Sequence, residues 1–86
     1  MPRISAFYGI VIWMYRPDHP PPHFHAQYGE DWARLAIDGA TLLEGSLPPR
    51  ALRLVREWVA LHVPELLEDW RRAQAREELV PIAPLE

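Results

Sequence analysis

The sequence contains no cysteine and no lysine, and these two absences already narrow its chemistry. Without cysteine, the chain has no disulfide scaffold, no thiolate zinc site and no thiol nucleophile. All nine of its cationic side chains are arginine, whose planar and permanently charged guanidinium group suits carboxylate or phosphate. A formal net charge of −3 is unlike the strongly basic profile of a dedicated nucleic-acid-binding protein.

Long hydrophobic runs are also missing. The longest mostly apolar stretch, Ile4–Tyr15, falls far short of the ~20 residues that span a bilayer. It does not resemble a secretion signal, because only Arg3 precedes it and no small-residue cleavage site follows. We therefore expect a cytoplasmic protein without membrane contact. A length of 86 residues predicts a single domain over residues 1–86.

The first part of the chain, residues 1–47, is predicted to form strands. Ile4–Tyr15 is rich in β-branched and aromatic residues, and both of its alternating faces are apolar, as in a strand that is covered on both sides. Gly9 interrupts this strand and suggests a bulge. Three shorter strands are expected over Phe24–Tyr28, Trp32–Ile37 and Thr41–Leu47.

A two-residue hairpin turn is predicted at Asp38-Gly39, between the last two of these strands. Such a turn fixes which residues lie opposite one another. The expected neighbours are Leu35 with Leu42, Ile37 with Ala40, and Arg34 with Leu43.

Residues 48–77 are predicted to form two helices, because their apolar residues recur at helical spacing. Pro49 suits the first position of a helix, and Pro64 is expected to end the first helix and begin the second. Trp58 and Trp70 are expected in the core.

Residues 78–86 are predicted to be an extended tail that lies along a groove or reaches a neighbouring molecule. The expected fold is therefore α+β, with an antiparallel sheet of about four strands packed against two C-terminal helices. The doubly apolar first strand and this tail are the candidate surfaces for contact with a partner protein or a second copy of the chain.

An unusual cluster of imidazole and carboxylate side chains precedes the second predicted strand. Three of the four histidines lie within residues 19–25, in a loop that several prolines stiffen. Histidines two positions apart on a strand project from the same side. Imidazole and carboxylate together suit zinc, nickel, copper or iron, so a divalent transition metal such as zinc is a candidate cofactor. The candidate metal ligands are Asp18, His19, His23 and His25.

The same cluster has other interpretations. The histidines could be structural, with hydrogen bonds to backbone carbonyl groups in the turn. They could also belong to a metal-free ribonuclease, which needs a base, an acid and a cation. The candidate catalytic residues are then His23, His25, Arg34 and Tyr28. A His-hydrophobic-His nuclease is disfavoured, because none of the three tyrosines lies on a predicted helix.

Nearly the whole chain resembles a bacterial family known as domain of unknown function 4160. The resemblance extends from the N-terminal segment to the second predicted helix, and its most distinctive part is the Pro-Pro-His-Phe-His run. The residues that carry it include Pro2, Ile4-Ser5, Gly9–Ile12, Met14-Tyr15, Asp18-His19, Pro21–Ala26, Tyr28–Glu30, Leu43–Gly45, Leu47-Pro48, Arg50–Leu52, Trp58, His62, Glu65-Leu66 and Trp70. Pro20 departs from the pattern, since it extends the usual two prolines to three.

This resemblance implies no established activity. Genes of the family look as if they often adjoin a second short gene, of domain of unknown function family 2442, and such pairs resemble toxin–antitoxin modules. We therefore expect a small cytoplasmic module that binds a partner protein, with the family 2442 product as one candidate. The alternative is a ribonuclease or metal-dependent hydrolase that uses His19, His23 and His25, in which case RNA is a possible ligand.

Overall fold

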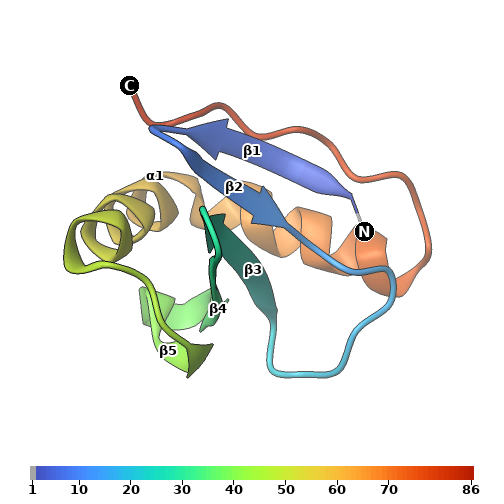
Figure 1. Ribbon diagram of the computed structural model, residues 1–86. Coiled ribbons are helices and arrows are strands. Elements are labelled where there is room, and N and C mark those ends of the chain that lie inside the picture. The colour runs from blue at the N-terminus through green and yellow to red at the C-terminus, as the bar shows by residue number, and fades with distance from the viewer. Residues whose placement is uncertain (1) are drawn as a thin grey trace.

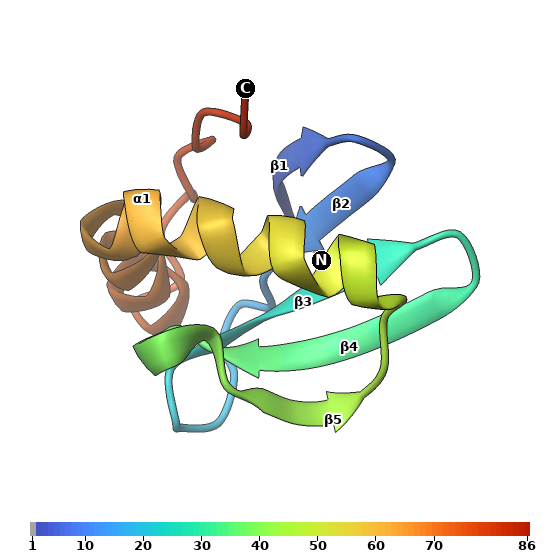
Figure 2. The same cartoon turned by 90° about the vertical axis from the view of Figure 1, so that its left-hand side faces the viewer.

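The computed structural model describes residues 2–86 and has an α+β fold. Five antiparallel strands pair in chain order: β1 (Arg3–Phe7), β2 (Ile10–Trp13), β3 (His23–Tyr28), β4 (Asp31–Ala36) and β5 (Leu42–Gly45). A short 3-10 turn, η1 (Asp38–Ala40), precedes β5, and a single helix, α1 (Pro49–Gln74), follows it. The helix lies on one face of the sheet, as Figures 1 and 2 show.

The prediction of one long first strand was wrong. Residues 4–15 form a hairpin in which β1 and β2 are joined by a tight turn at Tyr8 and Gly9. Both turn residues have positive φ, 50° and 80°, which is the geometry of the short turns that suit the twist of paired strands. The sheet therefore has five strands instead of about four, and the apolar residues on both faces are divided between two strands.

The predicted register at the β4–β5 hairpin is correct at one pair. Leu35 lies opposite Leu42, but an irregularity in the ladder then places Arg34 opposite Glu44 instead of Leu43. Ile37 does not pair with Ala40, since its N–H group donates to the carbonyl of Pro22. Asp38, Gly39 and Ala40 turn here, with positive φ at Gly39 and Ala40 (67° and 49°), where a two-residue turn was expected.

The prediction of two separate helices was also wrong, because Pro64 kinks α1 without ending it. A proline inside a helix lacks an N–H donor and its ring crowds the preceding turn. Here the backbone of His62 leaves the helical conformation, with φ −131° and ψ 24°, and the helix then continues to Gln74. The side chain of His62 bridges the kink, with its Nδ1 atom 2.7 Å from Glu65 Oε2.

The core lies between α1 and the sheet. Trp58 is fully buried, as expected, and its ring centroid is 5.3 Å from that of Phe7 and 6.0 Å from that of Phe24. Trp70 is half-buried at the edge of the same core. No helix among residues 2–86 combines the length and the apolar character needed to cross a membrane.

The C-terminal tail runs alongside β1, as Figure 1 shows. The N–H group of Ile82 donates to the carbonyl of Ile4 at 2.8 Å, and Trp58 Nε1 donates to the carbonyl of Ala83 at 2.8 Å. Leu79 and Ile82 are buried. The tail therefore completes the core of its own chain.

Asp69 fixes the start of this tail. Its side chain is buried, and its Oδ1 atom accepts a hydrogen bond of 2.9 Å from the N–H group of Val80. Burial raises the pKa of Asp69, and this effect exceeds the opposing effects of the Val80 N–H group and of Arg72. The folded chain therefore holds a proton on this carboxyl group more tightly than the unfolded chain does.

This raised pKa predicts a pH-dependent stability. Where the folded state binds more protons than the unfolded state, the free energy of unfolding falls as pH rises. The Asp69→Asn variant keeps an acceptor for Val80 but does not titrate. As pH rises above about 4, the ordinary pKa of an aspartate in an unfolded chain, we expect the wild type to lose stability relative to this variant, measured by urea denaturation. Asp38→Asn, at an exposed position, is the control, and an equal pH profile for the two variants would contradict the prediction.

Candidate functional site

The candidate site begins in the loop between β2 and β3, which is fastened to the end of α1. Gln74 makes two hydrogen bonds with the backbone of Asp18: its Oε1 atom accepts from the N–H group at 3.2 Å, and its Nε2 atom donates to the carbonyl at 3.0 Å. Asp18 Oδ1 accepts a hydrogen bond of 2.7 Å from the N–H group of His19. The backbone and one carboxylate oxygen of Asp18 are thus fixed, and its other oxygen, Oδ2, faces His23.

His23 is the first residue of β3, and its side chain is only 1% exposed. Its ring packs against Trp70, with 5.2 Å between the ring centroids. Nδ1 lies 2.7 Å from the carbonyl oxygen of Pro21, and Nε2 lies 2.9 Å from Asp18 Oδ2. A carbonyl oxygen only accepts hydrogen bonds, so Nδ1 carries a hydrogen. A carboxylate also only accepts, so a proton or another cation has to lie between Nε2 and Oδ2.

His25 follows two residues later on the same side of β3. Its ring centroid is 5.5 Å from that of His23 and 4.7 Å from that of Tyr15, which meets it edge-on. Its Nδ1 atom is buried and has no hydrogen-bond partner within residues 2–86. Burial, and after it the neighbouring His23, lowers the pKa of His25. The imidazole is therefore neutral near pH 7 and offers a free lone pair.

Asp18, His23 and His25 each direct one ligand atom to a common place, and these three atoms lie within 4.8 Å of one another. One carboxylate and two imidazoles form a donor set that suits zinc and other divalent transition metals. The hydrogen bond from Nδ1 of His23 to a backbone carbonyl is typical of metal-ligating histidines, because it fixes the tautomer and the ring orientation. The three residues could therefore hold such an ion.

The other predicted site residues are placed differently. His19 is exposed and is not one of the three grouped residues. Arg34 lies directly opposite His25 on β4, and its Nε atom is buried without a partner in the described part of the chain. Tyr28 is three residues from His25, so its side chain lies on the other face of the sheet, beside the start of α1. The structure thus groups His23, His25 and Arg34 but not Tyr28.

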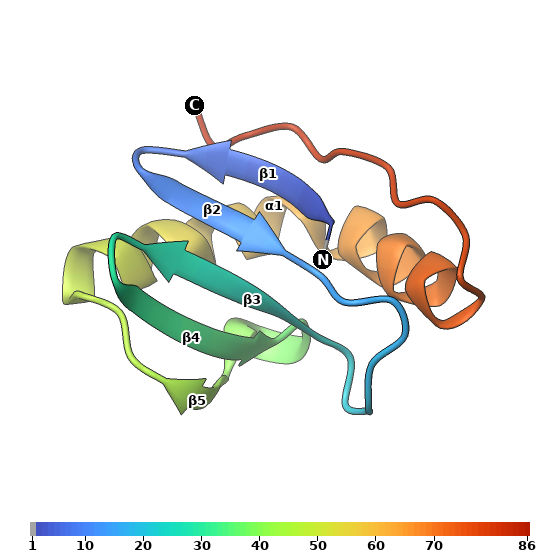
Figure 3. The same ribbon diagram turned by 45° about the vertical axis from the view of Figure 1, so that its right-hand side comes forward.

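Strand register also reveals a row of polar and aromatic side chains that sequence reasoning missed. The row crosses all five strands on the face opposite α1, which is turned toward the viewer in Figure 3. Trp13 belongs to this row and stacks on Trp32, with 6.4 Å between the ring centroids. Alternation within each strand could have suggested the row only if β1 and β2 had been recognised as separate strands. Its members are Arg3, Trp13, His25, Arg34 and Glu44.

Comparison with known proteins identifies a family and nothing more specific. A family model described as a domain of unknown function, DUF4160, matches residues 9–71. No curated protein matches the chain. No solved structure matches it either. The matched residues run from the β1–β2 turn through both histidines of the candidate site to the second half of α1. Because the match covers most of its length, the chain belongs to the family of domain of unknown function 4160.

Proposed function

We propose that this protein binds a divalent transition metal through Asp18, His23 and His25 and acts as a metal-dependent hydrolase. The observation that carries the proposal is that one ligand atom each of Asp18, His23 and His25 lies within 4.8 Å of the other two, with Nδ1 of His25 unpartnered in the described residues. A bound metal would replace the proton that joins Asp18 Oδ2 and His23 Nε2, which lie 2.9 Å apart. The neutral imidazole of His25 provides the third ligand.

Three protein ligands leave a coordination position for water, which is the arrangement of catalytic rather than structural zinc sites. A metal in such a site lowers the pKa of bound water to about 7 and so supplies hydroxide as a nucleophile. Arg34, opposite His25, provides a permanent positive charge for an anionic oxygen of the substrate. These groups favour a phosphoester substrate. If the enzyme is a ribonuclease, this substrate is the phosphodiester of RNA. A metal-free ribonuclease is supported less well, because Tyr28, one of its candidate catalytic residues, lies on the other face of the sheet.

A partner-binding function is the second candidate. The apolar surfaces of the first strand and of the tail, which suggested a partner, are largely buried within the chain's own core. A different surface supports the idea: Trp32, which is 39% exposed and stacks on Trp13 on the face of the sheet opposite α1. Exposed aromatic residues are enriched at protein interfaces. The occupant could be the product of an adjacent family 2442 gene in a cytoplasmic toxin–antitoxin-like pair, or a second copy of this chain.

The metal proposal is tested by elemental analysis of protein purified without a histidine tag or chelator, followed by a zinc titration. We expect about one metal ion per wild-type chain. The His23→Ala/His25→Ala variant should bind zinc at least ~100-fold more weakly, because two of three ligands are lost. His19→Ala is the matched control and should bind as the wild type does.

Equal zinc affinity in the wild type and the double variant would contradict the metal site. Hydrolysis of a phosphodiester such as bis(p-nitrophenyl) phosphate then separates a catalytic from a structural metal. Arg34→Gln should retain the metal but lose activity if Arg34 binds the anionic oxygen. For the second candidate, co-purification with the family 2442 product should survive the double histidine variant and be lost in Trp32→Ser.

A further inference from the structure

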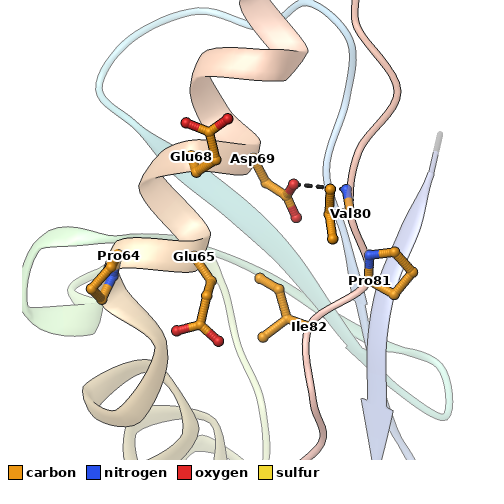
Figure 4. A pocket seen from close by; sticks show the side chains of 7 residues that line it. All are labelled: Pro64, Glu65, Glu68, Asp69, Val80, Pro81 and Ile82. Carbon is orange, nitrogen blue, oxygen red and sulfur yellow. Dashed lines mark hydrogen bonds between the residues drawn. The ribbon is translucent and has the colours of Figure 1, made fainter.

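A cavity of about 280 Å³ lies between the second half of α1 and the C-terminal tail. Figure 4 shows it from close by. Its walls are mostly apolar and come from Pro64 on the helix and from Val80, Pro81 and Ile82 on the tail. The cavity shares no residue with the Asp18–His23–His25 site.

One buried carboxylate oxygen in this cavity has no partner. Asp69 is 1% exposed, and its Oδ1 atom accepts from the N–H group of Val80. Its Oδ2 atom is buried and makes no hydrogen bond to any residue in the described range 2–86. An unpaired buried carboxylate is costly, so a ligand that donates a hydrogen bond and carries positive charge would be held strongly here.

The other carboxylates that line the cavity already have partners. Glu68 contacts Arg71 and Arg72, at 2.8 Å and 2.9 Å. Glu65, one helical turn before Asp69, lies 2.7 Å from His62. Its side chain is 50% exposed, so it adds negative charge at a side of the cavity that is open to solvent. Arg71, the arginine nearest to Asp69 in sequence, is thus paired with Glu68. Asp69 Oδ2 therefore remains available to a ligand.

The size and the lining of the cavity limit what it can hold. Its volume of about 280 Å³ lies just below the ~300–1,000 Å³ found for small-molecule sites, so it suits a short molecule. The apolar walls suit a chain of methylene groups. One free oxygen matches the point charge of an ammonium group better than the two-pronged guanidinium group, which needs two acceptors.

We propose that this cavity binds a small aliphatic amine, with the ammonium nitrogen on Asp69 Oδ2 and the carbon chain against Val80, Pro81 and Ile82. Such a ligand neutralises the buried carboxylate and covers the apolar walls at the same time. It would also join the tail to α1 at the point where Val80 meets Asp69.

The test is a titration of the full chain with pentylammonium, followed by ¹H–¹⁵N NMR. We expect a saturable shift of the amide signals of Val80 and Ile82, and at least ten-fold weaker binding of the neutral isostere 1-pentanol. Asp69→Asn should bind amine and alcohol equally. Val80→Trp should abolish binding by filling the cavity, and it tests the site independently because Val80 is 49% exposed and its replacement leaves Asp69 in place. Glu57→Gln, at an exposed position elsewhere on α1, is the matched control and should bind as the wild type does.

Equal binding of amine and alcohol by the wild type, or no saturable shift, would overturn the proposal and leave Asp69 with a purely structural role. Binding of Nα-acetyl-lysine methylamide but not of pentylammonium would also overturn it, in favour of a lysine side chain from another protein. The experiment needs no metal, so its result is independent of the Asp18–His23–His25 site.

Discussion

Replacing Trp58 by alanine is expected to lower the free energy of unfolding by about 3–5 kcal/mol, the usual cost of removing a large aromatic side chain from a core. Trp58 is fully buried, and its ring contacts those of Phe7 on β1 and Phe24 on β3. Its Nε1 atom also holds the tail through the carbonyl of Ala83. The variant therefore loses packing between the helix, two strands and the tail at once. Since small domains have about 5–15 kcal/mol of stability in total, much of it would be lost.

Urea denaturation followed by circular dichroism measures this change. Leu61→Ala is the control, because Leu61 lies on the same helix but is 65% exposed, and it should cost less than about 0.5 kcal/mol. Trp58→Phe should fall between the two, because it keeps most of the packing but not the hydrogen bond to Ala83. Equal losses for Trp58→Ala and Leu61→Ala would show that the tail and the helix do not share one core.

Replacing Gly45 by alanine is expected to have the second large effect, lowering the free energy of unfolding by about 2–5 kcal/mol. Gly45 ends β5 with φ +77°, a conformation that costs any other residue energy. A Cβ atom at this position would collide with the carbonyl oxygen of Trp32 and lie 3.1 Å from the Cα atom of Ala33. Both atoms belong to the backbone of β4, so the clash can be relieved only by moving β5 away from its neighbour.

Gly29→Ala separates the cost of the positive φ from the cost of the collision with β4. Gly29 also has positive φ, 60°, but a Cβ atom there would meet no other atom within 4 Å. It should therefore cost only about 1 kcal/mol, the conformational part. Thermal denaturation of the two variants measures the difference. Equal melting temperatures would mean that the contact between Gly45 and Trp32 is not important for stability.

The α+β class and most of the strand positions could be predicted from the sequence, because alternation and helical spacing are local signals. The β1–β2 turn could not, because its first residue is Tyr8, and a bulky side chain at positive φ gives no local signal. Gly9 indicated an interruption of the predicted strand, but a single glycine is compatible with either a bulge or a turn. Similarly, Pro64 indicated a break in the helix, and only the backbone of His62 shows that the break is a kink.

The candidate site was predictable in part. His23 and His25 are grouped because they are two positions apart on one strand, which the sequence shows directly. The choice of Asp18 rather than His19 depends on Gln74, which holds the loop from a position 56 residues further along the chain. Asp69 carries no local signal of a special role in the sequence. Its role depends on the tail that covers it, which local spacing does not reveal.

The order of the strands has a consequence for how the chain folds. Each strand pairs with the next one in sequence, so the whole sheet can assemble through short loops, and a topology with mostly local contacts favours fast folding. The hydrogen bond between Ile82 and Ile4 is different, because it closes nearly the entire chain into a loop. We expect the sheet to form first and the tail to dock last. The state that precedes docking would expose Ile4 and Trp58 and would be the one most prone to self-association.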